Sequence, residues 1–248
     1  MGEAIQYSYV FEFEDGDTRQ YDISVDAATC KLNNPAPEVL PSWTHLQHHQ
    51  CPNCPLSSDE KYCPAAVNIA TVVDNCAEII SHKTVHIQVT TPNRTVSAKT
   101  TVQRALSSLL GLLMATSDCP HTQFFKPMAY FHLPMASQEE TIFRAISTYF
   151  LAKYFKGEKS EVFDLNALCD IYTDMQVVNE CLVKRLQSCT LAKSDCSVFC
   201  RMRKSSTGET IKACSQSNRR LVPSQSSINV EMAMSVTLSM TRKLKLFG

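Results

Sequence analysis

The sequence predicts an α+β fold in which two β-hairpins form a four-stranded antiparallel sheet packed against a helical bundle, in the order ββαββααα. Two observations support this fold class. Two pairs of segments alternate apolar and polar residues, and four longer segments repeat apolar residues every three or four positions. Because 44% of the 248 residues are apolar and 19% are charged, we expect most of the chain to fold around a hydrophobic core.

The two hairpins account for all four predicted strands. The alternating segments are residues 5–13, 18–25, 83–91 and 94–101. Residues 14–17 read Glu-Asp-Gly-Asp, and Pro92-Asn93 separates the second pair, so both turns have residues typical of hairpin connections. We expect the two hairpins to complete one sheet.

Four segments have the periodicity of helices, namely residues 65–82, 101–116, 137–157 and 164–186. The second is apolar on nearly every side, which predicts a central buried helix. The third begins with a capping box, in which Ser137 is the N-cap and Glu140 follows three residues later. Asp164 is expected to cap the fourth. The inner face of the third helix is expected to carry Ile142, Phe143, Ile146, Tyr149, Phe150 and Tyr154.

The segment before the capping box, residues 124–134, is dense in aromatic residues. We expect it to be extended and clamped between helices by its aromatic rings. A pocket lined by this segment, with Lys126 and His132 as its polar groups, is the alternative.

The composition places a boundary near residue 188. Residues 1–188 are predicted to form a single α+β domain with a cysteine-rich loop at 43–64, and residues 189–248 form a tail rich in Ser, Cys and Arg. Two interpretations of the tail stay open: a poorly ordered extension, or the product of a frameshift.

Composition also excludes several function classes. Lys and Arg (24) balance Asp and Glu (24), which argues against a general nucleic-acid binder. With only 6 glycines the chain has no phosphate-binding loop and no nucleophile elbow. No signal peptide or membrane-spanning run is recognisable, so we expect a cytoplasmic protein with reduced thiols, for which a protein partner remains open.

The 12 cysteines are the unusual feature of the composition. Cys51, Cys54 and Cys63 form a C-x2-C-x8-C pattern in a polar loop. A tight turn brings two cysteines separated by two residues to the same point, and a third thiol can close a third vertex of a metal site. Both tetrahedral zinc and a cubane iron–sulfur cluster need a fourth ligand.

We favour residues 118–121 as the source of the fourth ligand. Cys119 repeats the Cys-Pro dipeptide and directly follows the predicted buried helix, and His121 lies two residues later. The carboxyl end of a helix disfavours a free thiolate, whereas a metal cation reverses that penalty. The alternative ligands for the fourth position are His45, His48 and His49.

Unliganded cysteines are the competing interpretation, because a cysteine-rich chain produces some C-x2-C spacing by chance. Four cysteines outside the motif are expected to act as small hydrophobic residues: Cys30, Cys76, Cys169 and Cys181. The tail cysteines, Cys189, Cys196, Cys200 and Cys214, match no ligand pattern.

The Cys-Pro motifs also carry a resemblance. The stretch CPNCPL from Cys51, the Cys63-Pro64 dipeptide and the stretch CPHTQFFKPMAYFHLP from Cys119 resemble an uncharacterised family of bacterial proteins described only as a domain of unknown function. The resemblance covers residues 5–187 and implies a bacterial, soluble setting without a known activity.

The residues therefore predict a structural zinc site built from Cys51, Cys54, Cys63 and Cys119 or His121. An iron–sulfur or thiol redox sensor would use the same cysteines. An enzyme with an open metal position would need a base, for which Glu139 or Glu140 is the candidate. A cofactor-free interaction protein would use its sheet face.

Overall fold

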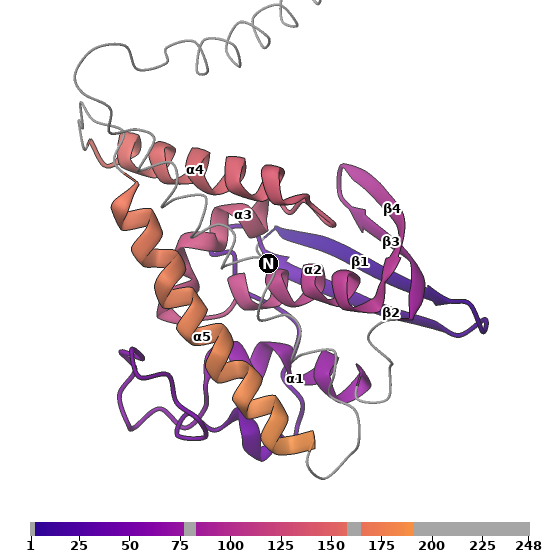
Figure 1. The fold of residues 1–248 in the computed structure, drawn as a ribbon, viewed down its shortest axis with the longest axis horizontal. Coiled ribbons are helices and arrows are strands. Elements are labelled where there is room, and N and C mark those ends of the chain that lie inside the picture. Colours follow the sequence, from indigo (N-terminus) through magenta and orange to yellow (C-terminus); the bar gives the residue numbers. More distant parts are fainter. Residues whose placement is uncertain (1–2, 77–82, 158–164, 191–248) are drawn as a thin grey trace, which may run out of the picture.

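The computed structural model describes residues 3–76, 83–157 and 165–190 (Figure 1). Its strands are β1 (Ala4–Phe13), β2 (Thr18–Asp26), β3 (Thr84–Thr91) and β4 (Arg94–Thr101). They form one antiparallel sheet in the order β2-β1-β3-β4. The predicted four-stranded sheet is therefore confirmed, and the first strands of the two hairpins are the pair that joins them.

Alternation along the strands decides which face of the sheet is buried. In β1, Tyr7, Tyr9 and Phe11 are buried, and they alternate with residues that are less covered. Tyr9 lies opposite Tyr21 on β2 and Val89 on β3, both buried. One continuous apolar face results, because the side-chain period of a strand is two.

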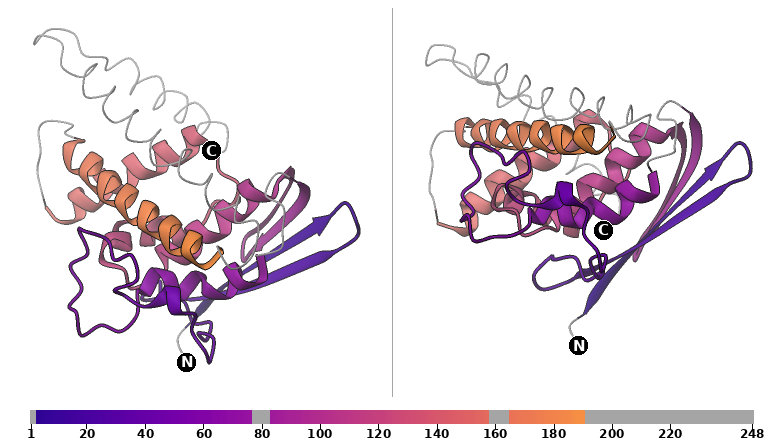
Figure 2. Two further views of the ribbon diagram at one scale, coloured as in Figure 1. Left: turned by 60° about the horizontal axis from the view of Figure 1, so that its bottom comes forward. Right: turned by 90° about the horizontal axis from the view of Figure 1, so that it is seen from below.

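The helices lie on the side of the sheet that carries this apolar face, and most of them share one core with it (Figure 2). They are α1 (Pro64–Cys76), α2 (Val102–Ala115), α3 (Lys126–Tyr130), α4 (Gln138–Phe155) and α5 (Asn166–Thr190), with the 3-10 helices η1 (Ser42–Thr44) and η2 (Pro120–Phe125). As predicted, α2 is the central helix, with most of its residues buried. The capping box at Ser137 and Glu140 is also confirmed.

Two expectations about helices are wrong. The aromatic segment 124–134 is not extended, because the end of η2 and all of α3 lie within it. Pro120 and Pro127 stand in the first turns of these helices, where the fixed φ of proline favours helix and its missing N–H costs nothing.

The inner face of α4 differs from the prediction as well. Tyr149 is buried as expected, but Phe143 is 55% exposed and Tyr154 is 76% exposed. The helix buries a narrower stripe around Ala145 and Tyr149, which pack against Leu168 and Tyr172 of α5. Apolar periodicity alone overestimated the width of the contact.

Several expectations fall outside the described residues. These are the end of the helix predicted at 65–82, the cap at Asp164, the tail beyond Thr190, and the side chains of Cys76 and Cys189. In the described ranges, no helix is long and apolar enough to cross a bilayer.

Candidate metal centre

The cysteine-rich loop is closed at its base by a short antiparallel ladder. His45 pairs with Tyr62 in an isolated bridge, and the Leu46 N–H donates to the Lys61 carbonyl at 3.0 Å. The Cys63 N–H donates to the Thr44 carbonyl at 2.8 Å. Cys63 is therefore fixed, buried, immediately before α1.

The Cys51–Cys54 segment is a tight turn, in which the Cys54 N–H donates to the Cys51 carbonyl at 3.0 Å. Two neighbouring elements hold this turn. The Asn53 side-chain amide donates to Asp174 Oδ1 of α5 at 3.0 Å, and His121 Nε2 of η2 lies 2.8 Å from the Asn53 carbonyl. Because a carbonyl oxygen only accepts, His121 Nε2 is the donor.

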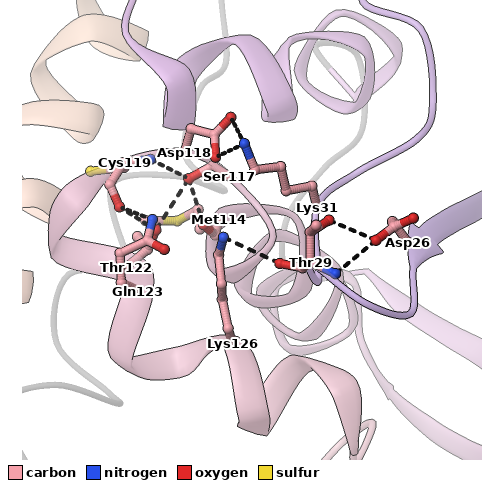
Figure 3. A network of polar contacts seen from close by, with 10 residues as sticks. All are labelled: Asp26, Thr29, Lys31, Met114, Ser117, Asp118, Cys119, Thr122, Gln123 and Lys126. Carbon is pink, nitrogen blue, oxygen red and sulfur yellow. Dashed lines mark hydrogen bonds and ion pairs between the residues drawn. The ribbon is translucent and has the colours of Figure 1, made fainter.

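Side-chain hydrogen bonds fix the backbone around Cys119 (Figure 3). Ser117 Oγ donates to the Met114 carbonyl at 2.7 Å and accepts from the Cys119 N–H at 3.3 Å. The Cys119 carbonyl accepts from Thr122 Oγ1 at 2.8 Å and from Gln123 Nε2 at 3.1 Å. Cys119 thus follows the end of the buried helix α2, as expected, and local side-chain hydrogen bonds hold its backbone.

The same corner is tied to the end of β2. Lys31 forms an ion pair with Asp118 at 2.9 Å, and Lys126 Nζ donates to the Thr29 carbonyl at 3.4 Å (Figure 3). Both contacts are exposed to solvent, so they orient the corner more than they stabilise it.

Burial and neighbouring thiols both affect the ionisation of Cys51 and Cys119. Burial raises the pKa of Cys119 to about 11, and the neighbouring Cys63 and Cys54 contribute to this rise. Burial also raises the pKa of Cys51, with contributions from Cys181, Cys63 and Cys54. Cys54 and Cys63 are thus electrostatic neighbours of both Cys51 and Cys119, which come from segments far apart in the chain.

Cys181 is the member of this group that sequence reasoning missed. It lies on α5, is 5% exposed, and is among the groups that raise the pKa of Cys51. Cys181 lies on the buried face of α5 with Val178 and Leu182. Its spacing in the sequence is therefore that of a small core residue. No local signal distinguishes it, since its neighbour Cys51 belongs to a distant loop.

The described cysteines are free thiols, namely Cys30, Cys51, Cys54, Cys63, Cys119, Cys169 and Cys181. Among the side chains that the structure describes, no three His, Cys, Asp or Glu residues are arranged so that they could hold a metal ion. The thiols of the cluster are neighbours, and ligation would require their side chains to turn toward a common point.

The histidines are engaged elsewhere. Besides the bond from Nε2 to Asn53, the other ring nitrogen of His121 lies 3.7 Å from Asp174 Oδ2, so both nitrogens face partners. The His45 ring packs on Tyr62 at 4.9 Å between centroids, and His48 Nε2 is 2.6 Å from Ser188 Oγ. His121 therefore positions the Cys51–Cys54 turn.

The side chains suggested for other roles also have partners. Glu140 accepts from the Ser137 N–H at 2.7 Å and Glu139 accepts from Ser137 Oγ at 2.8 Å, both at the exposed start of α4. His132 Nε2 contacts the buried Tyr9 hydroxyl. Capping of α4 therefore explains Glu139 and Glu140, and packing against Tyr9 explains His132.

A family model described as domain of unknown function DUF6901 matches residues 5–217 of this sequence. The chain belongs to the DUF6901 family. The match extends past residue 187, where the resemblance in the sequence was expected to end. No curated protein and no solved structure matches the chain significantly. The DUF6901 description names no activity, so the function has to be inferred from the cysteine cluster.

Proposed function

We propose that this DUF6901 protein binds one structural zinc ion through Cys51, Cys54, Cys63 and Cys119. The observation that carries the proposal is that Cys54 and Cys63 are electrostatic neighbours of both Cys51 and Cys119, although the four thiols come from a loop, the residue before α1 and the residue before η2. Four thiolates are a common ligand set of structural zinc.

The protonation of the thiols supports a cation at this place. Burial and neighbouring thiols raise the pKa of Cys51 and Cys119, so both are neutral near pH 7 in the absence of metal. A divalent cation reverses this preference, because it stabilises the thiolates and displaces their protons. The site would therefore exchange protons for zinc.

The arrangement favours a structural role for the metal. With four protein ligands, tetrahedral zinc has no open position for water or substrate. The ion would tie the Cys51–Cys54 turn to α1 and to the end of α2, regions whose backbones are already held by hydrogen bonds. The zinc would then stabilise the folded state against the unfolded chain.

The metal content of the purified protein tests this proposal. We expect about one zinc per chain and no visible absorption when the full chain is purified from cells grown without added metal and analysed by mass spectrometry for zinc and iron. Iron with a brown colour would instead establish the iron–sulfur alternative. Absence of metal, with ready alkylation of Cys51, Cys54 and Cys63, would contradict both and favour a cofactor-free interaction protein.

A further inference from the structure

Helix α4 has apolar side chains on two opposite faces. The face around Tyr149 is buried against α5. On the other face, Phe143, Leu151 and Tyr154 follow one another at helical spacing, and Phe155 adjoins them. We call these four side chains the α4 stripe. Each of them is more than half exposed, from 55% for Phe143 to 78% for Phe155, so the stripe faces solvent.

The stripe belongs to a helix at the outer edge of the described helices. Figure 1 shows α4 along this edge, with α3 and α5 both on one side of it. Phe131, directly after α3, is 74% exposed, and its carbonyl accepts from Arg144 of α4 at 2.9 Å. Phe131 therefore lies beside the first half of α4 and adds exposed apolar surface there.

The exposed area is large for a chain that acts alone. A fully exposed aromatic side chain offers about 150–250 Å². At their exposed fractions, the α4 stripe and Phe131 together present on the order of 600 Å² of apolar surface. The largest apolar patch on a typical monomer covers about 300–600 Å², and a stable interface takes about 800 Å² from each partner. This surface therefore supplies most of one side of an interface.

Charges at the two ends of α4 indicate what fits the stripe. The first turn carries Glu139 and Glu140, and Lys156 follows the last turn as the C-cap. When two α4 helices pack antiparallel, the acidic start of each lies against the basic end of the other, and the opposed helix dipoles attract. The same arrangement sets Phe143, at one end of the stripe, toward the partner's Tyr154 at the other end.

We propose that two copies of this chain associate through α4, antiparallel about a twofold axis, so that each copy buries the α4 stripe of the other. A twofold interface has to be complementary to itself, and an apolar stripe between charges of opposite sign meets this condition. A different partner would need an apolar helix face of the same length with the same order of charges, which α4 itself already provides. The dimer does not depend on the zinc site.

The size of the surface also sets the strength that we expect. Two copies of the stripe and of Phe131 bury about 1,200 Å² in total, at the lower end of the range for specific interfaces. Association should therefore be reversible, with a dissociation constant on the order of micromolar.

Sedimentation equilibrium of the full-length protein tests the proposal, from about 1 µM to about 200 µM chain. A reducing agent is present, so that cysteine cross-links do not contribute. We expect the mass to rise from one chain to two chains across this range. A wild type that stays monomeric would overturn the proposal and leave the stripe to another segment of the chain or to another protein.

A charged stripe provides the decisive variant. Leu151→Glu combined with Tyr154→Glu should stay monomeric at every concentration, because the dimer would bury four carboxylates. Both positions are exposed, so the variant should fold, which circular dichroism checks. Val39→Glu is the matched control, since Val39 is 85% exposed but lies outside α4, and it should dimerise as the wild type does. Equal dimerisation of the stripe variant and the wild type would place the interface elsewhere and refute the proposal.

An exchange of charges tests the antiparallel arrangement without touching the stripe. Lys156→Glu should weaken association by about threefold to tenfold, because it sets like charges against each other at both ends of the helix pair. Adding Glu139→Lys should strengthen association again, since opposite charges then face each other once more. Failure of the second change to compensate the first would rule out the antiparallel pairing.

Discussion

Cys119 immediately precedes η2 and His121 lies within it, and the surroundings of their side chains differ. Cys63 and Cys54 are electrostatic neighbours of the Cys119 thiol, while both nitrogens of His121 face Asn53 and Asp174. The residue that would ligate the metal and the residue that holds the turn are therefore distinguishable by substitution.

We expect Cys119→Ser to lose most of its zinc and to melt about 10 °C below the zinc-loaded wild type, because the metal stabilises the folded state that binds it. Zinc analysis and thermal unfolding measure the two effects. Cys30→Ser is the control, since Cys30 is buried but its thiol contacts the Lys126 carbonyl. Equal zinc content in Cys119→Ser and wild type would return the fourth position to the histidines.

His132 provides a second prediction at this scale. Burial beside Tyr9, and then the charge of Arg144, lower the pKa of His132 to about 3, whereas an unfolded histidine titrates near 6.5. Between these values the unfolded chain binds more protons, so stability falls as the pH is lowered. We expect the wild type to lose about 1–2 kcal/mol more than His132→Gln between about pH 7 and pH 5. Urea denaturation at both pH values measures the two losses. An equal loss in the wild type and in His132→Gln would contradict this.

At the scale of the element, α5 organises the cysteine-rich loop through a buried cation. Arg185 is 1% exposed and donates to the carbonyls of Trp43, His45 and Leu46. Carbonyl oxygens accept from the two terminal guanidinium nitrogens, whereas the buried Nε has no hydrogen-bond partner among the described residues. The Arg185 guanidinium fixes the position of the loop, because the loop carbonyls lose hydrogen bonds when it is removed.

We expect Arg185→Met to reduce the free energy of unfolding by about 3 kcal/mol, since the buried Trp43 and Leu46 carbonyls lose this donor and the His45 carbonyl loses one of its two. Urea denaturation measures the loss. Lys184→Met, at the exposed neighbouring position, should change stability little. Similar losses in both variants would show that Arg185 does not hold the loop.

The capping box of α4 is a second element-scale feature with a defined energy. Ser137→Ala removes the acceptor of the Glu140 N–H and should cost about 1 kcal/mol in urea denaturation. Ser147→Ala, at an exposed interior position of α4, should be neutral or slightly stabilising because alanine favours helices. If Ser137→Ala left the free energy of unfolding unchanged, the start of α4 would contribute nothing to the stability of the folded protein.

For the molecule as a whole, local patterns predicted the architecture. Strict alternation in β1 and β3 determined the buried sheet face, and the dense apolar run in α2 determined the central helix. The helical conformation of residues 120–130 was not predicted, because aromatic content does not distinguish an extended from a helical backbone, whereas Pro120 and Pro127 stand in the first turns of η2 and α3.

The cysteine cluster was only partly predictable. Cys51, Cys54, Cys63 and Cys119 share Cys-Pro contexts, and Cys54 and Cys63 are electrostatic neighbours of both Cys51 and Cys119. Cys181 carries no such context, and its membership depends on how α5 crosses the loop, which is a tertiary contact. The engagement of His121 by Asn53 and Asp174 likewise depends on three segments meeting.

X-ray absorption at the zinc edge of the purified full-length protein tests the proposed metal centre most directly. Zinc bound by Cys51, Cys54, Cys63 and Cys119 predicts a shell of four sulfur atoms at about 2.3 Å and no nitrogen ligand. A nitrogen at about 2.0 Å would contradict the four-thiolate site and point to a histidine, and a protein without zinc would contradict the metal centre itself.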